Sequence, residues 1–173
     1  MSERSLAPLI LTLKLDSQTF HQFDSLRQQH FPPERNFLPA HVTLFHALPG
    51  DQKLSIQQTL REICAQTPNF ALQFSRLRFL GQGVAIDIDS LELRQLRQNL
   101  AKIWDPWLSR QDQQGYRPHI TIQNKVTSAA ARQLFDQMIE QWQPIEGAGK
   151  GLLLWYYQGG PWELAEDFSF RSP

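Results

Sequence analysis

The sequence predicts an α+β protein with a bilobal, duplicated fold, in which two antiparallel sheets with flanking helices enclose a central groove. Three observations support this prediction. Segments with the two-residue alternation of strands and segments with helical periodicity follow each other along the whole chain. The order of these segments is repeated. Two of the strands also carry the same pattern of a histidine, an apolar residue, a threonine and an apolar residue.

The first half of the chain is expected to contain three strands and two helices. Aromatic and aliphatic residues at helical spacing, preceded by Asp16 or Ser17 as the N-cap, predict the first helix. A loop with several prolines follows it, and a Pro-Gly-Asp turn closes the next strand. The strands are expected at 8–15, 41–48 and 70–80, and the helices at 17–30 and 55–66.

The second half repeats the series with one additional strand. A Gly-Gln-Gly turn at 81–83 leads into a strand in which apolar residues alternate with small and acidic ones. The following helix is expected to end near Trp104, because Pro106 disfavours helical backbone at the residue before it. The strands are expected at 84–90, 119–126, 149–158 and 162–170, and the helices at 91–104 and 127–142, the second capped by Thr127 or Ser128.

Two equal distances indicate that the halves are related by duplication. Gly81 lies 40 positions after His41, and Gly159 lies 40 positions after His119. Each histidine follows a proline loop, and each is followed by one helix, one strand and a glycine turn. Two related lobes that face each other would bring both histidines to one groove.

Length and composition are typical of a single globular domain. The chain has 173 residues, 41% of them hydrophobic, and 17 basic residues balance 17 acidic ones. This balance argues against a broad electrostatic grip on duplex nucleic acid or on an anionic membrane. We expect one domain over residues 1–173 with pseudo-symmetric lobes at about 1–82 and 83–173. Whether strands are exchanged between these lobes is left open.

The N-terminal segment and the cysteine content indicate the expected environment. The apolar run after Met1 is too short for a membrane helix, and it lacks the charged start and small-residue cleavage site of a secretory signal. Cys64 is the only cysteine, so neither a disulfide framework nor a cysteine-based metal cluster can form. We expect a soluble, cytoplasmic and monomeric protein.

The repeated pairs are His41 with Thr43 and His119 with Thr121. Side chains of a strand alternate between its faces, so each histidine shares a face with the threonine two positions later. An imidazole can accept or donate a proton near neutral pH, and a threonine hydroxyl can donate a hydrogen bond to an anionic oxygen. One such pair alone is more often structural, since threonine is a good strand former. Two pairs across one groove suit a phosphodiester without any metal ion.

The two motifs, the second within Arg-Pro-His-Ile-Thr, and the closing Gly-Gly-Pro-Trp-Glu-Leu segment resemble those of the 2H phosphoesterases. This family includes the 2′-5′ RNA ligase-like proteins and the RNA 2′,3′-cyclic phosphodiesterases, and the resemblance covers nearly the whole chain. It implies metal-independent chemistry on 2′,3′-cyclic phosphate ends or 2′-5′ linkages. By position it implies that His41, Thr43, His119 and Thr121 are the catalytic set. By the same analogy His41 would be the general acid and His119 the general base.

Five further residues are candidates for substrate binding. Arg117 precedes the second histidine by two positions, and its guanidinium is suited to hold a phosphate. Lys125 follows that histidine by six positions, which places it on the same face of a regular strand. Arg35 lies in the proline loop at the expected mouth of the groove. Tyr116 and Phe37, beside the two motifs, are candidates for stacking on a base.

No metal or other cofactor is expected. A zinc site of His41, His46 and His119 would require a bend, because five positions separate the first two and a regular strand would turn His46 to the other face. His46 is also not accompanied by a carboxylate on the same strands.

The sequence leaves two functions open. The first is a phosphoesterase that hydrolyses 2′,3′-cyclic phosphates of RNA ends or nucleotides, with reversible 2′-5′ RNA ligation left open. The second is a non-catalytic module that binds nucleotides or RNA ends in the same groove. We favour the enzyme, because binding alone does not require a second histidine as a proton partner.

Overall fold

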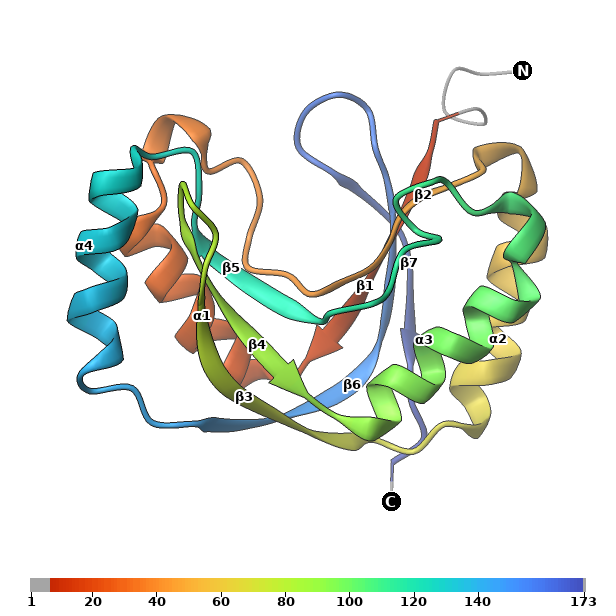
Figure 1. Ribbon diagram of the computed structural model, residues 1–173. Helices are drawn as coiled ribbons and strands as arrows, with labels where there is room; N and C mark the ends of the chain where they lie inside the picture. Colours follow the sequence, from red (N-terminus) through yellow and green to blue (C-terminus); the bar gives the residue numbers. More distant parts are fainter. Residues whose placement is uncertain (1–6, 173) are drawn as a thin grey trace.

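The computed structural model describes residues 7–172 and shows a strongly curled antiparallel sheet with helices on its outer side (Figure 1). The α+β class predicted from the sequence is therefore confirmed. The strands are β1 (Leu9–Leu15), β2 (Thr43–Leu48), β3 (Phe70–Phe79), β4 (Val84–Asp89), β5 (His119–Gln123), β6 (Ile145–Tyr156) and β7 (Glu163–Ser169). The α-helices are α1 (Ser17–His30), α2 (Lys53–Gln66), α3 (Leu91–Ile103) and α4 (Ser128–Ile139). Short 3-10 helices lie at η2 (Pro33–Arg35), η3 (Gly50–Gln52) and η4 (Asp105–Trp107).

Strand β6 joins what the sequence predicts as two sheets into one hydrogen-bonded sheet. The strand order is β2-β1-β6-β3-β4-β5, and β7 also pairs with β6. The first part of β6 pairs with β3 over 145–149, and its later part pairs with β1 and β7 over 149–156. We call β1, β2, β7 and the later part of β6 the first lobe, and β3, β4, β5 and the early part of β6 the second lobe.

The helices of the two sequence halves are interleaved in space. Helix α1 follows β1 of the first lobe but packs against β5 of the second lobe. Helix α4 covers β3 and β4 of the same second lobe. Helices α2 and α3 lie together on the opposite side of the molecule (Figure 1). Helix α2 packs against β6 and β7. Trp104, at the end of α3, is buried and stacks edge-on against Phe45 of β2.

Local signals explain where two of the helices begin. The Asp16 carboxylate caps α1 by accepting from the Thr19 N–H at 3.1 Å, and it also accepts from the Ala148 N–H at 2.9 Å. The Thr127 hydroxyl caps α4 by accepting from the Ala130 N–H at 3.1 Å. Each was one of two cap residues that the sequence allows.

Strand β6 begins at Ile145, four residues earlier than the sequence predicts, and its glycines are positions of close packing. A Cβ atom on Gly147 would lie 2.7 Å from the Thr19 hydroxyl, and one on Gly149 would lie 2.7 Å from the Phe70 ring. The missing side chains therefore let α1 and the aromatic core approach the strand.

The two motif strands confirm the predicted alternation, but their ends differ from the prediction. Val42, Leu44, Ile120 and Ile122 are all buried. Strand β2 begins at Thr43, two residues later than predicted. The Val42 carbonyl directly before it already accepts a hydrogen bond from the Leu13 N–H of β1. Strand β5 ends at Gln123 because the chain turns at the next residues.

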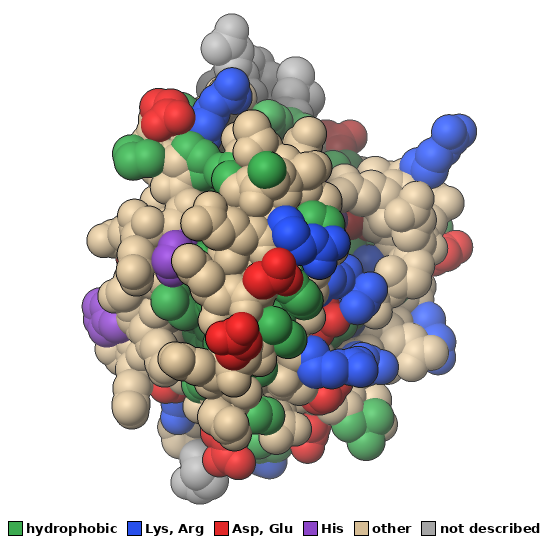
Figure 2. Space-filling view, turned by 60° about the vertical axis from the view of Figure 1, so that its left-hand side comes forward, with side chains coloured by type: hydrophobic (Ala, Val, Ile, Leu, Met, Phe, Trp, Pro, Cys, Tyr) green, Lys and Arg blue, Asp and Glu red, His purple; other side chains and the backbone are tan. Residues whose placement is uncertain are grey.

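Two properties of the surface bear on the partners that the protein can bind. Within residues 7–172, no helix has both the length and the apolar character that a membrane crossing requires. On the face shown in Figure 2, Lys and Arg side chains lie among Asp and Glu side chains instead of forming one large basic field. This mixture agrees with the equal numbers of acidic and basic residues in the sequence.

Gly151 tests the pairing of β6 with β7. A Cβ atom there would lie 2.2 Å from the Phe168 carbonyl oxygen, so Gly151→Ala must displace β7. We expect this variant to lower the free energy of unfolding by about 1–3 kcal/mol. The matched control is Gly160→Ala, because no atom lies within 4 Å of the added Cβ. Denaturant unfolding followed by tryptophan fluorescence measures both variants, and equal stabilities would contradict the described pairing.

Candidate active site

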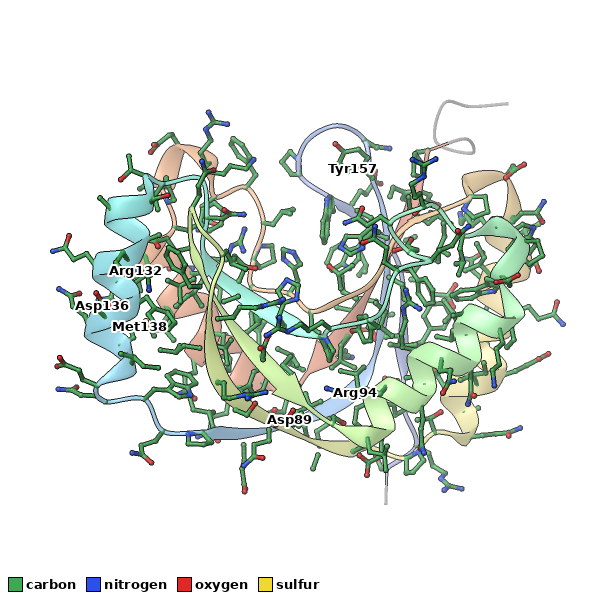
Figure 3. All side chains as sticks on the ribbon, viewed as in Figure 1. Asp89, Arg94, Arg132, Asp136, Met138 and Tyr157 are labelled. Atoms are coloured by element: carbon green, nitrogen blue, oxygen red, sulfur yellow. The ribbon has the colours of Figure 1, made fainter. Side chains whose placement is uncertain are left out.

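The two motifs meet in one cavity of about 320 Å³. Figure 3 shows nitrogen-bearing side chains converging in the space between the lobes, above β5. All four residues of the predicted catalytic set line this cavity. They are His41, Thr43, His119 and Thr121.

Both imidazoles are held in the same way. The Nδ1 atom of His41 lies 2.8 Å from the carbonyl oxygen of Pro39, and Nδ1 of His119 lies 2.9 Å from the carbonyl oxygen of Arg117. In each motif the acceptor is thus two residues before the histidine. Because a carbonyl only accepts, Nδ1 carries the proton, and Nε2 of each neutral ring is left as the proton acceptor.

Burial sets the protonation of these rings. It lowers the pKa of His41 to about 4, against the opposing effect of the hydrogen bond to Pro39. The charge of His119 contributes to this lowering, so the two rings interact electrostatically. Burial also lowers the pKa of His119, against the effect of its hydrogen bond to Arg117. Both rings are therefore neutral near pH 7 in the free cavity.

The threonines are anchored through their backbones, which leaves their hydroxyls for a ligand. The Thr43 carbonyl accepts from the Tyr116 hydroxyl at 2.9 Å, and the Thr121 carbonyl accepts from Arg27 at 3.1 Å. Neither threonine hydroxyl has a hydrogen-bond partner among residues 7–172. Each hydroxyl can therefore donate to an oxygen of a bound anion.

Two buried arginines hold the motif strands. Each lies on a helix that follows a strand of one lobe, and each binds the motif strand of the other lobe. Arg27 of α1 holds the second motif through its bond to the Thr121 carbonyl. Arg97 of α3 donates to the Leu44 carbonyl of the first motif at 2.7 Å. Each guanidinium also lies over an aromatic ring, Phe31 for Arg27 and Phe45 for Arg97.

An arginine pair around Asp87 adds positive charge beside His119. Asp87 is buried on β4, directly opposite His119 in the strand register. One carboxylate oxygen lies 2.7 Å from Arg117 Nη2, and the other lies 3.0 Å from Arg78 Nε. Arg78 Nη2 is buried and has no hydrogen-bond partner within residues 7–172. Two cations against one carboxylate leave the cavity with an excess positive charge.

The structure places some of the five predicted substrate-binding residues in the cavity and others outside it. Arg117 and Tyr116 line the cavity, but Tyr116 packs against Arg97 and serves as a fixed wall. Phe37 is 62% exposed and lines a second, adjacent cavity. Arg35 is exposed on η2 and lines neither of these two cavities.

Lys125 does not lie on the strand of His119 and does not line the cavity, so the prediction of a regular strand that reaches it is wrong. Strand β5 ends two residues before it, and the Lys125 backbone is left-handed, with φ of 62°. The Asn124 side chain stabilises this turn by accepting from the Lys125 N–H at 2.9 Å. The assumption of a regular strand through 126 caused the error.

The sequence interpretation missed several cavity residues. Trp162, in the closing Gly-Gly-Pro-Trp-Glu-Leu segment, was not among the candidates, but its ring meets that of His41 edge-on at 4.8 Å between centroids. His46 was expected on the opposite face, yet it lines the cavity together with Asp112. Two irregularities of β2, between Thr43 and Phe45 and between Phe45 and Leu48, interrupt the alternation on which that expectation rested. Asp87 could have been noticed in the sequence, because it is an acidic residue in the middle of the largely apolar strand expected at 84–90.

The described residues do not supply a metal site. Across residues 7–172, no three His, Cys, Asp or Glu side chains are placed to hold one ion. His41 and His119 each use Nδ1 for a backbone carbonyl, and their remaining nitrogens face a cavity rich in positive charge. This donor set suits an anion better than a divalent cation.

Solved structures with the same fold include proteins of Thermus thermophilus and E. coli. TT0787 of Thermus thermophilus is 14% identical, with a TM-score of 0.65, and the match covers 95% of this chain and 98% of that one. E. coli LigT complexed with 3′-AMP is 17% identical, with a TM-score of 0.62 and the same coverage of 95% and 98%. At these identities the likeness shows the fold alone.

Sequence comparison identifies the family. No curated protein sequence matches the chain. The sequence model of the 2′-5′ RNA ligase superfamily matches residues 15–161, which include both motifs and most of the chain. This match confirms the resemblance that the motifs indicate. The chain therefore belongs to the 2′-5′ RNA ligase superfamily, the group of the 2H phosphoesterases.

Proposed function

We propose that the chain is a metal-independent phosphoesterase that hydrolyses the 2′,3′-cyclic phosphate of RNA ends or nucleotides. One observation carries this proposal. Two imidazoles, each with Nδ1 bound to a carbonyl and Nε2 available, line a single cavity together with two free threonine hydroxyls. A simple binding site has no need of two such proton carriers.

The proposed reaction uses one ring as base and the other as acid. By analogy with the family, His119 takes a proton from water, and the water oxygen forms a new bond to phosphorus. The bond from phosphorus to one ribose oxygen breaks, and protonated His41 gives its proton to that oxygen. The product is a phosphate monoester with one free hydroxyl, so atoms and charge balance. A low pKa makes protonated His41 a strong acid for this step.

The remaining groups of the cavity would hold the phosphate oxygens. Thr43 and Thr121 can each donate a hydrogen bond, and Arg78, which also lines the cavity, adds positive charge beside them. Arg117 would add charge at the exposed side. Phosphoryl transfer depends mainly on such positioning and charge stabilisation.

The second cavity would take the base. It measures about 270 Å³, adjoins the first, and shares His41 and Trp162 with it. Phe37 and Trp155 supply further aromatic surface. Stacking on such surfaces suits every base, so this cavity favours a nucleotide without selecting its sequence. That E. coli LigT has been crystallised with 3′-AMP and with ATP supports a nucleotide ligand for this fold.

The first test is hydrolysis of a short RNA that ends in a 2′,3′-cyclic phosphate, with EDTA present. We expect a 2′- or 3′-phosphate product from the wild type. His41→Ala and His119→Ala should each lower kcat by on the order of 10²–10⁴-fold, the usual contribution of a general acid or base. The control is His21→Ala, because His21 is exposed on α1 away from the cavity.

Three outcomes would speak against the enzyme. Full activity of either cavity variant would remove that ring from the mechanism. Loss of activity in EDTA, restored by a divalent metal, would contradict the metal-independent reaction. Tight binding of the RNA with no product would favour the non-catalytic module. Incubation of the cyclic-phosphate RNA itself with a second RNA carrying a free 5′-hydroxyl would show whether 2′-5′ ligation also occurs.

The second test is the pH dependence of kcat/KM. Activity requires one protonated and one neutral ring, and both pKa values lie below the usual 6.5. Above that pH both rings of the free enzyme are neutral, so the acid is lost. We therefore expect kcat/KM to fall about tenfold per pH unit between pH 7 and 9.

Circular dichroism over the same range serves as the control for folding. A kcat/KM that stays level or rises above pH 7 would contradict the lowered pKa values and the roles drawn from them.

A further inference from the structure

His46 is a third imidazole in the cavity, and it lies outside both repeated motifs. The regular alternation of β2 would turn it away from His41. The register of β2 against β1 slips twice, between Thr43 and Phe45 and between Phe45 and Leu48, so the alternation is interrupted and His46 lines the cavity. Its side chain is 45% exposed, so a ligand can reach it.

A buried carboxylate holds this ring in place. Asp112 accepts from the backbone N–H of His46 at 2.9 Å and from that of Ala47 at 3.0 Å, and it lies 3.1 Å from His46 Nδ1. Burial acts to raise the pKa of Asp112, but the hydrogen bonds from His46 and Ala47 outweigh it and keep the pKa below its usual value. The carboxylate is therefore ionised, and Nδ1 of His46 donates to it.

Arg97 supports the loop that carries Asp112, since it is buried and donates to the Asp112 backbone carbonyl at 2.8 Å. The carboxylate of Asp112 is left for His46. With Nδ1–H of His46 directed to this carboxylate, a proton on Nε2 can be donated to an anionic oxygen of a ligand.

The cavity that His46 lines also carries several polar side chains. The loop that carries Asp112 contributes Gln111, Gln114 and Arg117 to the lining. The apolar cavity that suits a base lies instead against His41 and Trp162. The side chains near His46 therefore match the sugar-phosphate part of a longer substrate.

We propose that His46, oriented by Asp112, binds the internucleotide phosphate next to the reacting cyclic phosphate, which makes an oligonucleotide rather than a mononucleotide the preferred substrate. This inference rests on the proposed function, since it assumes that His41 and His119 flank the reacting phosphorus. His46 contributes a charged hydrogen bond to binding and takes no part in proton transfer to the reacting group.

Two dinucleotides that both end in a 2′,3′-cyclic phosphate test this proposal. One has a normal phosphodiester between its nucleosides, and the other has a neutral methylphosphonate. We measure the ratio of kcat/KM for the charged over the neutral dinucleotide. In His46→Phe, which keeps a ring but no nitrogen, this ratio should fall about fivefold, as expected for a partly exposed charged hydrogen bond. In His21→Phe, an exposed control, the ratio should stay at the wild-type value.

The outcomes separate this inference from the proposed function. An unchanged ratio in His46→Phe would overturn the phosphate contact, even if both rates fell together. His46→Ala should show the same loss of ratio and replaces the phenylalanine variant if that chain fails to fold. If the wild type hydrolyses neither dinucleotide, the proposed function is wrong. In that case calorimetry gives the ratio of binding affinities for the charged and the neutral dinucleotide. A lower ratio in His46→Phe than in the wild type would support the phosphate contact, and an unchanged ratio would overturn it.

Discussion

The site depends on one short interaction that occurs twice, the hydrogen bond from a histidine Nδ1 to the carbonyl two residues before it. In each motif this bond fixes the tautomer and the orientation of the ring at once. A proline lies at each acceptor, since Pro39 itself supplies the carbonyl for His41 and Pro118 directly follows Arg117, whose carbonyl holds His119. The partial burial that lowers the pKa of both rings then makes their protonation depend on the partner ring and the bound anion.

Two features of the fold keep these two rings in one cavity. One is a strand that both lobes share, and the other is a pair of helices that each cover the lobe opposite to the strand they follow. Strand β6 belongs to both lobes, so the lobes cannot separate without breaking one continuous strand. Helices α1 and α3 reach across, and Arg27 and Arg97 bind the motif strand of the lobe that each helix covers. A buried guanidinium that donates to a strand carbonyl is costly to leave unpaired. The crossed arginines therefore fix the distance between the motifs more firmly than apolar packing alone.

Much of this arrangement could be predicted from the sequence. The alternation around His41 and His119 correctly separated core from cavity, and the equal spacing of the motifs correctly indicated that they meet. The rest depends on irregular backbone that periodicity does not reveal. Two irregularities of β2 accompany the placement of His46 in the cavity, and β5 ends before Lys125, which does not line the cavity. The expected strand 149–158 does not include Gly147, because the Thr19 side chain that packs against this glycine is distant in sequence.

The central claim is that one phosphate contacts both imidazoles at the same time. Nuclear magnetic resonance of ¹⁵N-labelled histidine rings, during titration with a nucleoside 3′-phosphate, tests this claim most directly. We expect the Nε2 signals of His41 and His119 to shift together with one Kd and a stoichiometry of one ligand. Signals that shift at different ligand concentrations, or a shift of only one ring, would contradict it.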